Sequence, residues 1–285
     1  MKTNQYHSTD ELSFEQKLWC GAGTILRSIR PLILYACLPA CFMTVGMILM
    51  RDRTAESMIS ASGNFYYTLG IIFTFVLLHK RSKKRGSSLE EDTTMDWKIL
   101  DRNKSVCLLL MGFGFGIFFS SLVTVIPFPA FLMDSYRESS STLSEGTDQI
   151  LALFSTSILA PVTEEIIFRG YMLNRQLTFF TERTCIWITS VLFALCHVSL
   201  IWIIYALIMG LLLAKVSIEE DNIAYSILLH VGFNCNVVPV WFINNIQALN
   251  NVIFANHLLV AVYGIAAGYG ALLLYKKYRK ETKKW

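Results

Sequence analysis

Apolar runs long enough to cross a membrane recur along the whole chain, separated by short charged stretches. A helix needs about 20 mostly apolar residues to span the hydrocarbon core of a bilayer. The pattern predicts eight such helices and therefore an all-α fold, a polytopic membrane helix bundle. The expected ranges are 31–50, 62–79, 106–133, 149 to beyond 169, two helices within 185–216, 223–243 and 252–275.

Two of these spans carry features that bear on the site. Pro127 and Pro129 should break or bend the outer end of the third helix. The fifth and sixth helices share only 185–216, whereas two full spans need about 40 residues. We therefore expect this hairpin to stop short of the outer face, leaving room for water or a peptide around His197.

The basic residues predict how the bundle is oriented. With the N-terminus inside, all but three of the 25 Lys and Arg residues fall on the inner side, the exceptions being Arg51, Arg53 and Arg137. Cytoplasmic loops carry an excess of Lys and Arg, so both termini are expected in the cytoplasm. The segment 14–30 mixes apolar and basic residues and fits either an interfacial helix or a polar tail.

Composition supports a membrane protein and excludes several other classes. The chain of 285 residues is 54% hydrophobic and 16% charged, with a mean hydropathy of +0.47. Ordinary soluble domains have about 25% charged residues. The net charge of +4 comes from the basic inner segments, so no nucleic-acid partner is expected.

Ionisable side chains within predicted spans are the first candidates for function, because they are expensive there. Glu165 and Arg169 stand at i and i+4 with the acid first, the favourable order for a helical ion pair. Glu164 is rotated by about 100° on the helix and lacks this partner. The pattern indicates a structural Glu165 and a chemically active Glu164, unless both simply lie at the inner interface.

Two further motifs bring histidine into the membrane. Phe193 and His197 lie on the fifth predicted helix, and His230 and Asn234 form an i, i+4 pair on the seventh. A lone histidine is often a packing residue, and the second pair could merely join two helices by a hydrogen bond. Glu165 and His197 are equally far from the expected inward turn, which places them at the same depth.

The three motifs, in this order on successive helices, resemble the CAAX-protease and bacteriocin-processing (CPBP, or Abi) family of intramembrane endopeptidases. They read Glu164-Glu165-x-x-x-Arg169, Phe193-x-x-x-His197 and His230-x-x-x-Asn234. The resemblance covers about residues 149–243. It implies peptide-bond cleavage within the membrane.

By the family pattern, Glu164 would activate a water molecule and His197 would bind that water or the substrate. His230 and Asn234 would stabilise the oxyanion. The resemblance gives a supporting role to Glu165, Arg169 and Phe193.

The cofactor requirement is left open by these residues. The zinc-protease signature H-E-x-x-H is absent, and Glu164, His197 and His230 could hold zinc or act on water directly. We favour a mechanism without metal and keep zinc as the alternative.

The resemblance also sets the domain organisation and the expected partners. A cytoplasmic or interfacial segment 1–30 would precede three N-terminal helices in 31–148, a catalytic core in 149–243, and a last helix with a basic tail in 244–285. The substrate would be a membrane-docked peptide or protein, and the location a bilayer, with a bacterial cell membrane favoured. Two other functions stay open: a non-proteolytic immunity or regulatory protein, and a transporter or proton relay.

Overall fold

The computed structural model describes residues 13–49, 55–144, 149–197, 199–246 and 256–282, and in these ranges it contains helices and no strand. The helices are α1 Phe14–Leu49, α2 Ala55–Lys84, α3 Leu89–Thr93, α4 Arg102–Val125, α5 Ala130–Ser144, α6 Gln149–Phe154, η2 Ser155–Leu159, α7 Ala160–Glu165, η3 Ile166–Leu173, α8 Asn174–Gln176, α9 Glu182–Leu195, α10 Leu200–Glu220, α11 Ile223–Asn234, α12 Val237–Asn245 and α14 His257–Thr282. Elements α6 to α8 follow one another without a gap and form one long helix, which we call the motif helix.

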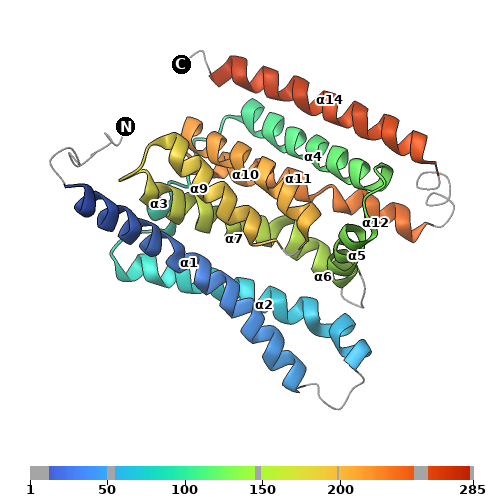
Figure 1. The fold of residues 1–285 in the computed structure, drawn as a ribbon, viewed down its shortest axis with the longest axis horizontal. Helices are drawn as coiled ribbons and strands as arrows, with labels where there is room; N and C mark the ends of the chain where they lie inside the picture. Colours follow the sequence, from blue (N-terminus) through green and yellow to red (C-terminus); the bar gives the residue numbers. More distant parts are fainter. Residues whose placement is uncertain (1–12, 50–54, 145–148, 198, 247–255, 283–285) are drawn as a thin grey trace.

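Within the described residues, six helical segments are long and apolar enough to cross a membrane. The predicted all-α membrane bundle is therefore confirmed, while the count of eight spans stays a prediction. Figure 1 shows α1 and α2 as a pair on one side of the bundle and α4 with α14 on the opposite side. The start of α1 and the end of α14 lie at the same end of the molecule, as two termini on one membrane face require.

Two predicted helices prove to be broken. The third ends at Val125 instead of continuing to 133, and α5 begins separately at Ala130. Pro127 and Pro129 cause this break, because proline lacks the amide hydrogen and disfavours helix at the preceding residue. The seventh span is interrupted after Asn234 by a turn, in which Asn236 Nδ2 donates to the Phe233 carbonyl at 2.6 Å.

The first helix begins earlier than predicted. It starts at Phe14 instead of residue 31 and runs continuously through Arg30, with Pro31 and Pro39 inside it. Prolines are tolerated within membrane helices because neighbouring groups can satisfy the freed carbonyls. Residue 30 is therefore no helix boundary, and 14–30 is not a separate helix. That this segment lies in the cytoplasm or at the membrane interface stays a prediction.

The hairpin of α9 and α10 is short on one side, as the sequence predicts. Helix α9 has 14 residues, or about 21 Å at 1.5 Å per residue, against a hydrocarbon core of about 30 Å. His197 lies in the connection that follows α9 instead of inside the helix.

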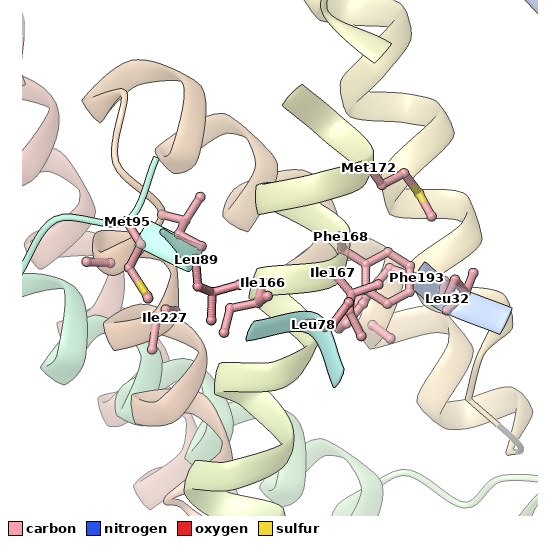
Figure 2. Close-up of a cluster of buried hydrophobic side chains, with 14 residues drawn as sticks. Leu32, Leu78, Leu89, Met95, Ile166, Ile167, Phe168, Met172, Phe193 and Ile227 are labelled. Atoms are coloured by element: carbon pink, nitrogen blue, oxygen red, sulfur yellow. The ribbon is translucent and has the colours of Figure 1, made fainter. Parts of the chain in front are cut away.

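A buried apolar cluster surrounds the motif helix (Figure 2). Leu32, Leu78 and Phe193 gather with Phe168 on one side of it, and Leu89, Met95 and Ile227 lie with Ile166 on the other. Side chains from α1, α2, α3, α9 and α11 thus fix the helix that carries Glu164 and Glu165.

Close backbone contact fixes α11 against α4. A Cβ atom on Gly112 would lie 2.0 Å from the Leu229 carbonyl oxygen, and one on Gly232 would lie 2.1 Å from that of Leu109. Small residues allow such approach between membrane helices. Gly232 lies between His230 and Asn234, so this contact also sets the position of the third motif.

We expect Gly232→Ala and Gly112→Ala to reduce the yield of folded protein, because the new methyl group overlaps a backbone carbonyl. Gly270→Ala is the matched control, since nothing lies within 4 Å of a Cβ there. Alanine is preferred to glycine in helices by about 1 kcal/mol, so the control should be neutral or stabilised. The melting temperatures of the purified variants test this; equal melting temperatures for all three would contradict the packing argument.

Candidate active site

The described residues enclose a cavity of about 860 Å³ that brings the candidate catalytic side chains together. Glu164, His197, His230 and Asn234 all line it. They come from the motif helix, from the connection after α9 and from α11, which are well separated in the sequence. The structure thus assembles the three motifs around one space.

Glu165 is fully buried and bonded on two sides. Its Oε1 accepts a 2.7 Å bond from Arg169 Nη1 and lies 2.9 Å from His230 Nδ1. Arg169 Nη2 donates to the carbonyl of Gly210 on α10 at 3.0 Å. The predicted Glu165–Arg169 pair is confirmed, and it joins three helices.

Glu164 faces the cavity instead. Its side chain is 16% exposed, whereas that of Glu165 is 0% exposed. Tyr35 of α1 donates its hydroxyl hydrogen to Glu164 Oε1 at 2.8 Å, and Oε2 lies 3.7 Å from His230 Nε2. The two adjacent glutamates therefore have different surroundings, as the helix geometry predicts.

The hydrogen bonds also indicate which ring nitrogens are protonated. His230 Nδ1 lies 2.9 Å from Glu165 Oε1, which already accepts a hydrogen bond from Arg169, so the contact is best described with Nδ1 as the donor. His197 Nδ1 lies 3.0 Å from the Phe193 carbonyl oxygen, which can only accept. Each histidine is thus held at Nδ1, and its Nε2 is available to another group.

Phe193 holds these groups in place by packing. Its ring lies 5.0 Å from the ring of His197 and 5.6 Å from that of His230, both edge to face. The guanidinium carbon of Arg169 lies 4.8 Å from its centroid, a favourable cation–π distance. Phe193 thus contacts members of all three motifs.

Asn234 is fixed by an irregular part of the motif helix. Its Nδ2 donates to the carbonyl of Thr156 at 2.8 Å, within the π-helical segment η2. The π-helical segments η2 and η3 flank α7, which carries both glutamates. Such segments are frequent at functional sites because they alter the path of the helix.

The predicted metal ligands do not form a ready-made metal site. Among the described residues, no group of three His, Cys, Asp or Glu side chains is arranged to hold a metal ion. His230 is tied to Glu165 through one nitrogen and faces Glu164 with the other. A histidine that ligates zinc commonly donates its other ring N–H to a carboxylate, so this hydrogen bond does not decide between the metal-free mechanism and zinc, and we derive no step through a metal.

Sequence reasoning missed two contacts of the site. Tyr35 binds Glu164, yet a tyrosine in an apolar helix is ordinary at membrane boundaries. Thr156 holds Asn234 through its backbone carbonyl, for which no side-chain pattern exists. The hydrogen bond between His230 and Glu165 joins two of the motifs, although each was predicted separately.

Known proteins match the part of the chain that forms this site. Residues 146–236 match the model of the family described as type II CAAX prenyl endopeptidase Rce1-like. The predicted relation to the CAAX-protease and bacteriocin-processing family is thus confirmed for the segment that contains all three motifs.

A curated protein is also similar to part of the chain. The chain is 30% identical over 125 residues to an uncharacterized 24.3 kDa protein of Escherichia coli, and the match covers 41% of the chain and 54% of the relative. The chain therefore spans about half the length of that relative. No solved structure matches the chain.

Proposed function

We propose that this protein is an intramembrane endopeptidase that cleaves a membrane-associated peptide or protein. The proposal rests on one observation: a single cavity between candidate membrane-spanning helices is lined by all four predicted catalytic side chains, Glu164, His197, His230 and Asn234. The Rce1-like match over the same residues supports the reaction class.

Glu164 is the proposed general base. Its Oε2 and His230 Nε2 are 3.7 Å apart, beyond a direct hydrogen bond but close enough for one water molecule to contact both. Glu164 takes a proton from this water as the oxygen attacks the scissile carbonyl carbon. It then gives the proton to the amide nitrogen as the C–N bond breaks.

Glu165 is proposed to position His230. The carboxylate accepts from His230 Nδ1 at 2.9 Å, as the carboxylate of a catalytic triad does with its histidine. When His230 also carries a proton on Nε2, it can donate that hydrogen to the oxyanion. Arg169 in turn holds Glu165 in place.

His197 and Asn234 are proposed to complete the site. His197 contacts the Phe193 carbonyl through Nδ1, which leaves Nε2 for a hydrogen bond with the attacking water or with a substrate amide. Asn234 uses one amide hydrogen on the Thr156 carbonyl and retains a second for the oxyanion.

The proposed substrate is a peptide docked in the bilayer, with a prenylated C-terminus as the first example to test. The bacterial-type alternatives are peptide pheromones and bacteriocin precursors. Mass spectrometry of membrane peptides from cells producing the wild type or Glu164→Gln tests the assignment. Fragments that appear only with the wild type are expected; identical peptide profiles would leave a non-proteolytic immunity or regulatory role as the better description.

Removal of metal should leave the activity intact, because a carboxylate base needs no Lewis acid. The purified wild type should retain cleavage after exhaustive dialysis against a strong chelator in a defined detergent. A zinc-dependent protease treated in parallel is the control. Loss of activity together with stoichiometric zinc, and recovery of both on adding zinc, would show that Glu164, His197 and His230 rearrange to bind metal.

A further inference from the structure

Away from the cavity, five arginines gather where α1, α2 and the end of the motif helix meet. Four of them, Arg27, Arg81, Arg85 and Arg175, line one small depression. Arg30 adds to the electrostatic repulsion that the other arginines exert on Arg175. We call this group the arginine cluster.

The depression is separate from the proposed active site, because the two linings share no residue. Its floor includes Ser28 and Leu78, each 1% exposed, and Tyr171 forms part of its wall. Leu78 also belongs to the apolar cluster of Figure 2, so the floor is part of the packed interior. The depression is small, about 20 Å³, and suits one small anionic group better than a nucleotide.

One acid compensates only a part of this charge. Asp92 forms an ion pair with Arg85 and accepts further hydrogen bonds from Ser82 and Ser87. Although burial raises the pKa of Asp92, these three partners lower it further, so the net shift is below its usual value. The carboxylate is therefore ionised at neutral pH, and its oxygens are already used by neighbouring groups.

The remaining arginines lack such a partner. Among the residues that the structure describes, Arg27, Arg30, Arg81 and Arg175 form no ion pair. These four side chains are exposed, and like charges held close together repel one another. A bound anion would remove this repulsion.

The cluster lies at one end of a candidate membrane span. Arg175 is the second-last residue of the span Gln149–Gln176, and the lipid headgroups lie where such spans end. Trp19, on the same helix as Arg27, is 77% exposed, and tryptophan is enriched at membrane interfaces.

We propose that the arginine cluster binds the phosphate group of an anionic ligand at the membrane surface. Guanidinium groups suit this ligand because their planar donors match phosphate oxygens in pairs. An anionic phospholipid headgroup and free phosphate offer the same chemistry, and the test separates them. This binding site is independent of the proposed peptidase activity.

The full chain is purified in an uncharged detergent, and its thermal unfolding is measured in two arms. The first arm adds sodium phosphate against sodium chloride at equal ionic strength. The second compares nanodiscs of phosphatidylcholine with nanodiscs that also contain phosphatidylglycerol. Stabilisation by phosphatidylglycerol alone identifies a lipid headgroup, and stabilisation in the phosphate arm identifies the free anion as a ligand.

The double variant Arg81→Gln with Arg175→Gln should lose the thermal stabilisation by the ligand. Arg85 is left unchanged because it forms the ion pair with Asp92. Arg81 and Arg175 line the depression and would bond to the phosphate directly, so the apparent affinity should fall by about tenfold or more. The matched control, Lys83→Gln with Lys84→Gln, removes the same charge from the end of α2 outside the depression and should weaken binding much less than the arginine variant does.

Two results would overturn the proposal: no response of the wild type in either arm, or equal losses in the arginine and lysine variants. The double variant Arg81→Lys with Arg175→Lys keeps the positive charges and serves as a control for a folding defect in the glutamine variant. It should bind several-fold more weakly than the wild type because lysine lacks the planar donor pair. Full wild-type affinity would indicate general surface attraction instead of a built site.

Discussion

Glu164→Gln is expected to abolish peptide cleavage while the amount of folded protein stays at the wild-type level. Glutamine keeps the size of the side chain and an oxygen that can accept the hydrogen bond from Tyr35. In the wild type, the Tyr35 hydroxyl donates this bond to Glu164 Oε1 at 2.8 Å. It cannot take a proton from water. General-base catalysis contributes about 10²–10⁴-fold in rate, so the loss should fall in this range or exceed it.

The measurement is the rate of cleavage of prenylated and unprenylated peptides by purified protein, together with the yield of monodisperse protein. Tyr35→Phe is the matched control, because it removes a hydrogen bond to Glu164 but keeps the carboxylate. A hydrogen bond to a charged group contributes about 1.5–3 kcal/mol, so its effect on rate should lie between about tenfold and about 160-fold. Undiminished cleavage by Glu164→Gln would refute the assigned base.

Arg169→Met and Glu165→Gln are expected to reduce the amount of folded protein severely, in contrast to Glu164→Gln. Both side chains are 0% exposed, and removing one leaves the other without its counter-charge. Breaking a buried pair costs about 3–5 kcal/mol. Detergent-resistant yield and melting temperature measure the effect.

The double variant Glu165→Gln with Arg169→Met separates charge from shape. Replacing both members of a buried pair is often close to neutral, so the double variant should be more stable than either single one. Arg279→Met, which removes a partner of the partly exposed pair with Glu219, should cost about 0–1 kcal/mol. If the double variant were less stable than the sum of both single losses, the ion pair would not be the source of the effect.

The sequence by itself determined the membrane helices and the resemblance of residues 149–243 to a known family, because both depend on local patterns of residues. Apolar length predicts membrane helices, and the i, i+4 spacing of Glu165 and Arg169 predicts their ion pair without any tertiary information. The same helical geometry separates Glu164 from Glu165. The range 185–216 is too short for two full spans and therefore predicts a short hairpin. Helix α9 is indeed short, with 14 residues.

Helix ends were harder to predict because they depend on competition with neighbours. Helix α1 continues through Pro31 where the change in composition predicted a start. The turn after Asn234 depends on Asn236, which bonds to Phe233 and also accepts from Ser120 of α4 at 2.6 Å. Hydropathy does not register such contacts.

Only the tertiary structure decided how the site residues are connected. The bond between His230 and Glu165 joins residues 65 positions apart, the bond between Tyr35 and Glu164 joins residues 129 positions apart, and the arginine cluster combines three helices. Helical periodicity relates residues within about one or two turns, whereas these contacts follow from packing such as the approach of Gly112 to Leu229. The sequence by itself determined which side chains are available for chemistry, and helix packing decided which of them meet.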